Sequence, residues 1–169
     1  MAEAEREARL TSWVSAYSDG LLRLCFLQLR DHSLCEDALQ ETFIKAWKAM
    51  PKYERANIQN DRAWLCRIAL NVCHDFQRSR WLRHVDAAHA LESLPPALTA
   101  VEPEDRTLLL DVMNLPEKSR TVILLYYYQQ LTMRDIAQVL HLDVSTVHAR
   151  LKKAEGLLRQ ELTEEVDAR

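Results

Sequence analysis

The chain has 169 residues, of which 48% are apolar, 28% are charged and only two are glycine, and its net charge at pH 7 is −3. This length suits one domain or two small ones, and the scarcity of glycine argues against sheet-rich folds, whose tight turns need residues with positive φ. The net charge excludes a uniformly basic coat, so any contact with nucleic acid has to come from local basic segments.

The N-terminal stretch predicts helix. Its first ten residues, MAEAEREARL, are charged where a secretory signal needs an apolar segment, and no apolar run of the chain reaches the roughly 18 residues of a membrane span. We therefore expect a cytoplasmic protein.

Within the predicted N-terminal helix, Gly20 is a candidate break between two helices. Apolar residues recur at helical spacing at Leu10, Trp13, Val14, Tyr17, Leu21, Leu24 and Leu27.

A second helix is predicted to begin at Ser33. Ser33 and Glu36 have the spacing of a capping box, in which each side chain satisfies a backbone N–H at the helix start. We expect Pro51 to end this helix, because a proline ring disfavours the helix interior. Its predicted buried stripe consists of Leu39, Phe43, Trp47 and Met50. Other faces carry the polar side chains of Asp37, Gln40 and Glu41.

A polar stretch, residues 52–61, predicts a loop before a long third helix over about 62–81. The helix is expected to bury Leu65, Ile68, Ala69, Val72 and Phe76. Its opposite side carries four polar or basic residues in register, namely Arg67, Asn71, His74 and Arg78.

Charge changes sign twice along the chain. Residues 62–84 carry five arginines and one aspartate, whereas residues 85–117 carry seven acidic residues and one arginine. Residues 144–160 are basic again, with four cations and one glutamate. The acidic segment also contains Pro95, Pro96 and Pro103 and shows little helical period before about Asp105, which indicates a linker between two helical modules.

The second module predicts a helix-turn-helix. Pro116 is suited to the first position of a helix, where its missing N–H is not needed. Thr132 and Asp135 predict the start of a short helix that contains Ile136, Ala137 and Leu140. After a short turn, Asp143 is a candidate cap for a longer basic helix. That helix is expected to bury Val147, Leu151, Ala154 and Leu158, and the pair has the form of a motif whose second helix enters the DNA major groove.

The four cysteines lack CxxC spacing and lie in apolar helical patterns, which predicts buried thiols rather than a metal or redox site. They are Cys25, Cys35, Cys66 and Cys73. The sequence offers no converging set of zinc ligands, no nucleophile and base pair and no glycine-rich phosphate loop. We therefore expect no metal, cofactor, catalytic residue or small-molecule substrate.

Two groups of motifs resemble regions 2 and 4 of bacterial RNA polymerase sigma factors, in that order. The motifs similar to region 2 are EDALQETFIKAW at 36–47 and AWLCRIALN at 63–71. Those similar to region 4 are LPE at 115–117 with Arg120, Leu131 and Thr132, DIA at 135–137 and STVHARL at 145–151. The chain's size resembles the extracytoplasmic-function (ECF) group, which keeps only these two regions. This implies two small all-α domains, 1–84 and 105–169, joined by a flexible linker at 85–104.

The resemblance assigns the first module two contacts. Asp37, Gln40 and Glu41 match positions that bind the core polymerase, although on periodicity alone they are an ordinary solvated helix face. Residues for the promoter −10 element must hold phosphates and an unpaired base. The candidates are Tyr53, Arg55, Asn57, Asn60, Arg67, Asn71, His74, Arg78 and Arg80. On composition alone, a soluble loop and a basic helix face explain them equally well.

The resemblance implies that the second module binds the promoter −35 element. From the residues alone, the alternative is that its helix pair packs against another domain and does not bind DNA. The candidate contacts are Arg134, Ser145, Thr146, His148, Ala149, Arg150, Lys152 and Lys153. Two positions depart from the family, which often has glycine where this chain has His141 and Ser145. These departures leave the docking on DNA, and so the promoter sequence, open.

The resemblance implies a protein that binds core RNA polymerase, reads promoter DNA at two elements and helps to open the −10 region without catalysing a reaction. An anti-sigma factor, often membrane-bound, is the implied inhibitory partner, which would hold the protein at the membrane. Two other interpretations remain from the residues alone. One is a stand-alone helix-turn-helix regulator that binds DNA as a dimer, and the other is an adaptor that binds polymerase but does not start transcription.

Overall fold

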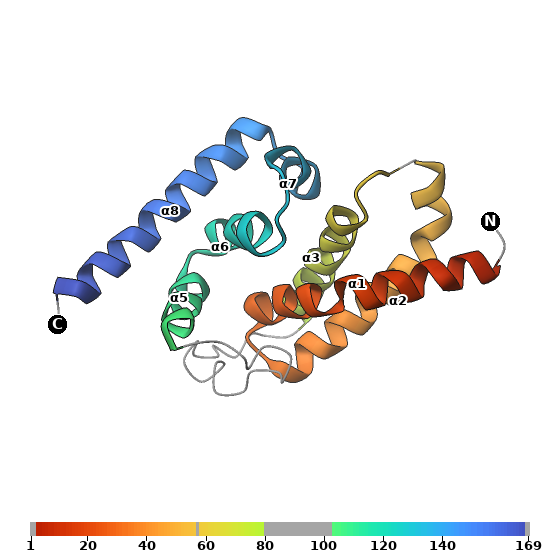
Figure 1. The fold of residues 1–169 in the computed structure, drawn as a ribbon, viewed down its shortest axis with the longest axis horizontal. Helices are drawn as coiled ribbons and strands as arrows, with labels where there is room; N and C mark the ends of the chain where they lie inside the picture. Colours follow the sequence, from red (N-terminus) through yellow and green to blue (C-terminus); the bar gives the residue numbers. More distant parts are fainter. Residues whose placement is uncertain (1–2, 57, 80–102, 168–169) are drawn as a thin grey trace. The chain divides into compact units, whose positions relative to one another are not determined.

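The computed structural model describes residues 3–56, 58–79 and 103–167, without the side chains of 103–106 and 161–167. Within these ranges every regular element is a helix, and the chain divides into two compact units, 1–85 and 86–169 (Figure 1). The predicted all-α class is confirmed. Most of the predicted linker, 85–104, falls outside the described residues. In the described ranges, no helix combines the length and apolar character needed to span a membrane.

In the first unit, the described residues up to 79 form a bundle of three helices that all pack against one another. Helix α1 spans Glu3–Leu29, α2 spans His32–Arg55 and α3 spans Asp61–Ser79 (Figure 1). The predicted break at Gly20 is wrong, since α1 runs through it. A glycine inside a helix costs about 1 kcal/mol relative to alanine. Burial of Leu21 and Leu24 directly after it offsets that cost, because each fully buried leucine contributes about 1.5–3 kcal/mol.

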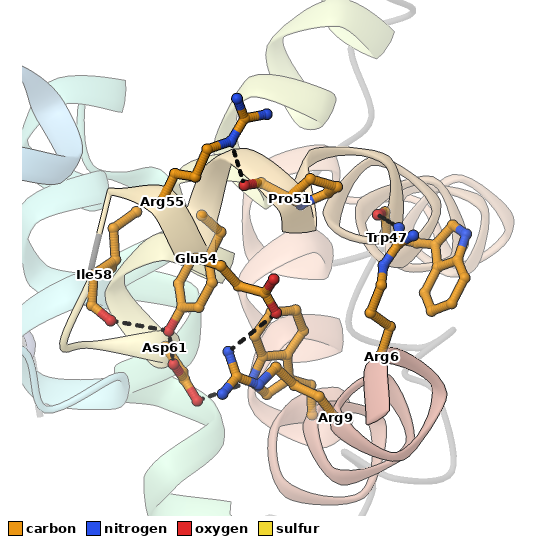
Figure 2. A network of polar contacts seen from close by, with 10 residues as sticks. Arg6, Arg9, Trp47, Pro51, Glu54, Arg55, Ile58 and Asp61 are labelled. Atoms are coloured by element: carbon orange, nitrogen blue, oxygen red, sulfur yellow. Dashed lines mark hydrogen bonds and ion pairs between the residues drawn. The ribbon is translucent and has the colours of Figure 1, made fainter. Parts of the chain in front are cut away.

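Helix α2 begins earlier and ends later than the sequence predicts. Its N-cap is Asp31, whose carboxylate accepts a hydrogen bond from Leu34 N at 2.9 Å, so the predicted start at Ser33 is wrong. The predicted end at Pro51 is also wrong, since the helix continues to Arg55. Proline lacks the N–H that would bond to the oxygen of Trp47, four residues earlier. That oxygen instead accepts a hydrogen bond from Arg6 Nη2 at 3.1 Å (Figure 2).

The buried face of α2 differs by one position from the predicted stripe. Of that stripe, Met50 is buried, whereas Leu39, Phe43 and Trp47 are only half-buried. The residues that are buried are Cys35, Ala38, Thr42, Ala46, Met50 and Tyr53. These side chains are mostly small, which allows α1 and α3 to approach the α2 backbone closely, and the larger side chains lie along the flanks.

Helix α3 and the cysteines follow their predictions closely. Leu65, Ala69 and Val72 are buried as expected, while Ile68 and Phe76 are half-buried. All four cysteines are free thiols in the core, as predicted. Burial raises the pKa of the Cys66 thiol to about 12, because the apolar core disfavours its charged form.

Over its described residues, 103–167, the second unit has five consecutive helical segments. They are α5 (Pro103–Asn114), α6 (Glu117–Ile123), the π-helical segment η2 (Leu124–Tyr128), α7 (Met133–Leu140) and α8 (Val144–Asp167). Pro116 directly precedes α6 rather than occupying its first turn. The corner between α5 and α6 is held by Arg120, which is 7% exposed and donates to the carbonyl oxygens of Met113 and Leu115.

Helices α7 and α8 form the predicted helix-turn-helix (Figure 1). The capping box at the start of α7 is confirmed, since Asp135 N donates to Thr132 Oγ1 and Thr132 N donates to the Asp135 carboxylate, both at 3.1 Å. Helix α8 begins directly after Asp143. Its buried side includes Val147, Leu151 and Ala154 as predicted, and Leu158 is half-buried.

Candidate polymerase and nucleic-acid interfaces

The candidate polymerase-binding residues lie on α2. Asp37 and Gln40 are exposed and Glu41 is half-buried. Ile44 follows these residues at helical spacing on the exposed face of α2 and is 45% exposed, so it adds an apolar side chain to this polar face. Sequence reasoning missed Ile44, although its position seven residues after Asp37 was a signal. Together these four residues form a mixed polar and apolar stripe, the α2 stripe.

The basic side of α3 is open to solvent over the described residues. Asn71, His74 and Arg78 are exposed and Arg67 is half-buried, whereas Arg80 lies outside the described residues. Asp75, on the same side, accepts a hydrogen bond from Lys45 Nζ at 3.0 Å. Lys45 belongs to α2, and its side chain is 40% exposed. The contact therefore places a cation from a second helix next to the basic side of α3.

The predicted loop at 52–61 is much shorter in the structure, because its first four residues belong to α2 and its last begins α3. Arg55 is exposed and Asn57 lies outside the described residues. Asn60 is half-buried and its Oδ1 accepts from Ala63 N at 3.0 Å, which caps α3. Tyr53 is only 4% exposed, so its predicted place in a loop open to DNA is wrong. Its ring contributes to the core instead.

Tyr53 belongs to an aromatic cluster at this end of the unit. Its ring centroid lies 4.5 Å from that of Trp64 and 5.3 Å from that of Trp13. The hydroxyl lies within hydrogen-bonding distance of Asp61 Oδ1 and of the Ile58 carbonyl oxygen, the latter at 3.1 Å. Trp13 Nε1 donates to the other Asp61 oxygen at 2.8 Å. Burial, followed by the hydrogen bond to Asp61, raises the pKa of Tyr53, so the hydroxyl stays protonated.

The candidate −35 residues gather at the start of α8 and at α7. Arg134 is the second residue of α7 and is exposed. On α8, Thr146 and Arg150 are half-buried, and the exposed candidates are Ser145, His148, Ala149, Lys152 and Lys153. Helix α8 therefore presents basic and hydroxyl side chains opposite the face that packs on α7.

His141 ends α7 in the left-handed region, with φ 53° and ψ 48°. An L-residue with a Cβ is strained there by roughly 1–2 kcal/mol, whereas glycine adopts this conformation freely. The turn keeps its shape with histidine, since Leu142 N bonds to the Ala137 oxygen at 2.9 Å. The left-handed end of α7 therefore forms with histidine at this position.

The second unit also contains an apolar groove of about 420 Å³, which the sequence did not predict. Tyr127, at its edge, is 54% exposed, and its hydroxyl donates to Glu155 at 2.6 Å. The lining residues are Leu108, Val112, Ile123, Tyr127, Tyr128, Glu155, Leu158 and Arg159.

Comparison with known proteins agrees with this arrangement. Residues 13–83 match the family Sigma-70 region 2, and residues 112–158 match Sigma-70, region 4. The chain is 31% identical over 163 residues to the ECF RNA polymerase sigma factor SigW of Bacillus subtilis, with 88% of this chain and 86% of SigW covered. It is 29% identical to the probable RNA polymerase sigma factor RfaY of Xanthomonas campestris, covering 91% of this chain but only 40% of RfaY.

A solved structure has the same fold. The sigma factor RpoE of Bartonella quintana, crystallised with the anti-sigma factor NepR, is 19% identical, with a TM-score of 0.73 over 90% of this chain and 96% of that chain. Both sigma regions are therefore present in order, on two helical units, in a chain that matches SigW over most of its length. The chain belongs to the ECF RNA polymerase sigma factors.

Proposed function

We propose that this protein binds core RNA polymerase, directs it to promoters through −10 and −35 elements and promotes strand opening, without catalysing a reaction itself. The observation that carries the proposal is the presence, in one chain, of both sigma-70 regions, the second built as a helix-turn-helix with an exposed basic helix. A regulator that only binds DNA needs the second unit and not the first, so the combination disfavours that alternative.

For polymerase binding we propose the α2 stripe, made of Asp37, Gln40, Glu41 and Ile44. The exposed carboxylate of Asp37 suits a basic partner surface, and Ile44, at the C-terminal end of the stripe, supplies apolar area. Carboxylates alone can attract a partner from solution, but burial of an apolar side chain is what slows its dissociation.

For the −10 element we propose the basic side of α3 together with residues 58–60. Arg67 and Arg78 are suited to phosphates, and the exposed Asn71 offers an amide donor and acceptor. The side-chain nitrogen of Asn60 is not used by the cap on α3, so its two N–H groups are available to an unpaired base.

For the −35 element we propose the start of α8, placed in the major groove. Lys152 and Lys153 are exposed and suited to phosphates, while Arg150 can reach a guanine edge with two donors. Arg134, at the N-terminal end of α7, is suited to a flanking phosphate.

We further propose an anti-sigma factor as inhibitory partner. The Bartonella quintana RpoE, which has the same fold, was crystallised with the anti-sigma factor NepR. An inhibitor of that class would keep the protein away from polymerase in the cytoplasm. An inhibitor that is itself anchored in the membrane would hold the protein at the membrane.

Run-off transcription with purified core polymerase tests this proposal. We expect discrete new transcripts from genomic fragments, including the region upstream of the protein's own gene, only when the protein is added. The double variant Asp37→Ala, Gln40→Ala should lose these transcripts and still fold. Binding to polymerase without initiation would favour the adaptor, and tight DNA binding that ignores polymerase would favour the stand-alone regulator.

A further inference from the structure

Three side chains from three helices meet beside residues 58–60. Trp13 comes from α1, Tyr53 from the last turn of α2, and Asp61 is the first residue of α3. Both Asp61 oxygens are engaged, one by Trp13 Nε1 at 2.8 Å and the other by the Tyr53 hydroxyl. Figure 2 labels Asp61 and draws both of its contacts as dashed lines. We call these three residues the Asp61 cluster.

The Asp61 cluster joins the two ends of the connection between α2 and α3. Tyr53 lies before this connection and Asp61 directly after it, so their contact closes the connection at its base. The Tyr53 hydroxyl also reaches the Ile58 carbonyl oxygen at 3.1 Å, a contact to the backbone inside the connection. Because the tyrosine is 4% exposed, water does not compete well for these contacts.

The cluster is held by more than its hydrogen bonds. The Trp13, Tyr53 and Trp64 rings pack at centroid distances of 4.5–5.4 Å, which prevents the tyrosine from turning away. Arg9 lies over the Tyr53 ring at 5.8 Å and forms an ion pair with Glu54 at 3.8 Å. Residues 58–60 therefore rest on a rigid base, although Gln59 itself is exposed.

A base can be selected by amide groups only if these groups are held within about 0.5 Å of the productive geometry. We propose that Trp13, Tyr53 and Asp61 are positioning residues for −10 recognition, which hold residues 58–60 in the conformation that selects the unpaired base. This inference rests on the proposed function of the protein. It gives a role in promoter specificity to Trp13 and Tyr53, two core residues that have little or no surface to offer to DNA.

The test uses holoenzyme assembled from core polymerase and full-length variants, with promoter libraries randomised in the −10 or the −35 element. Tyr53→Phe removes a single oxygen and keeps the ring. We expect it to reduce the preference for the best −10 base over the worst by about fivefold, in line with loss of one buried hydrogen bond, and to leave −35 preference unchanged. Asp61→Ala should reduce the preference further, whereas Asp61→Asn, which keeps one acceptor oxygen, should fall between them.

Gln77→Ala is the matched control, because it removes a hydrogen bond between α3 and α1 in the same unit, from Gln77 Nε2 to the Gln28 carbonyl oxygen at 3.2 Å, at the other end of α3 from residues 58–60. It should lower Tm yet keep the −10 preference. Unchanged −10 preference in Tyr53→Phe and Asp61→Ala, or an equal loss of preference in Gln77→Ala, would overturn the inference while the proposed function stands. A wild-type protein that never starts transcription would overturn both.

Discussion

Arg6 donates a hydrogen bond to the carbonyl oxygen of Trp47, the backbone acceptor that Pro51 leaves without its helical partner. The same guanidinium lies over the Trp47 ring, 4.4 Å from its centroid. One side chain of α1 thus compensates for the proline inside α2 in two ways. This explains how α2 continues for another turn and brings Tyr53 into the core.

The first prediction follows from this compensation. Arg6→Ala should destabilise the protein by about 1–3 kcal/mol, since it leaves a part-buried carbonyl without a partner and removes the contact between the cation and the ring. Urea unfolding gives this free energy. In a Pro51→Ala background residue 51 regains its N–H, so the same Arg6 substitution should cost less there. Equal losses in the two backgrounds would contradict the explanation.

The second prediction concerns Ile44. Ile44→Ser should weaken binding to core polymerase about fivefold, on the order of 1 kcal/mol, because the α2 stripe loses its apolar contact. Stability should change by no more than about 0.5 kcal/mol, since the side chain is largely exposed. Val14→Ser is the control, because Val14 is a comparably exposed apolar residue, 41% exposed, that lies on α1 and outside the stripe. Surface-immobilised core polymerase provides the measurement, and equal affinities for the two variants would argue against the stripe.

The third prediction concerns the end of α7. His141→Gly should stabilise the protein by about 0.5–1 kcal/mol, because relief of left-handed strain exceeds the added entropy of glycine in the unfolded chain. His141→Ala keeps the Cβ and should give no such gain. Thermal unfolding distinguishes the two variants, and a gain for alanine equal to that for glycine would show that strain is not the cause.

The fourth prediction concerns alkaline pH. The pKa of Cys66 is raised from 9.0 to about 12 in the folded protein, so folding favours the neutral thiol. Its contribution to stability is complete below about pH 9 and is lost as the pH rises towards 12. Across this range the free energy of unfolding should fall more steeply for the wild type than for Cys66→Ala, by up to about 1.4 kcal/mol per pH unit. Urea unfolding at pH 8, 9, 10 and 11 measures both slopes, and parallel slopes would contradict the prediction.

A structural feature could be predicted from the sequence when the residues that produce it lie close together in the chain. The capping box of Thr132 and Asp135 involves residues three apart, so the start of α7 was predicted correctly. The same holds for the helix-turn-helix, whose buried positions follow the helical period. The cap of α2 was predicted wrongly because Ser33 and Glu36 have the spacing of a capping box, whereas the helix is capped by the carboxylate of Asp31, two residues earlier.

The candidate −10 segment failed for a different reason. Pro51 and the polar residues after it are typical of a loop, and the contact that compensates for the proline comes from Arg6, 45 residues earlier and outside the local pattern. Tyr53 was therefore placed on the surface when it is in the core. No local pattern reveals Asp61 as its partner together with Trp13, because the aromatic cluster exists only once three helices have assembled.

The contacts of the Asp61 cluster also bear on how the first unit folds. The backbone hydrogen bonds within its helices are local. Two polar contacts of this unit join residues far apart in the chain: Trp13 and Asp61 are 48 residues apart, and Arg6 and Trp47 are 41 residues apart. Loop closure must precede such contacts, so the last turn of α2 and residues 58–60 form late, with the docking of α1. An α2–α3 hairpin without α1 would be helical and yet lack an ordered connection.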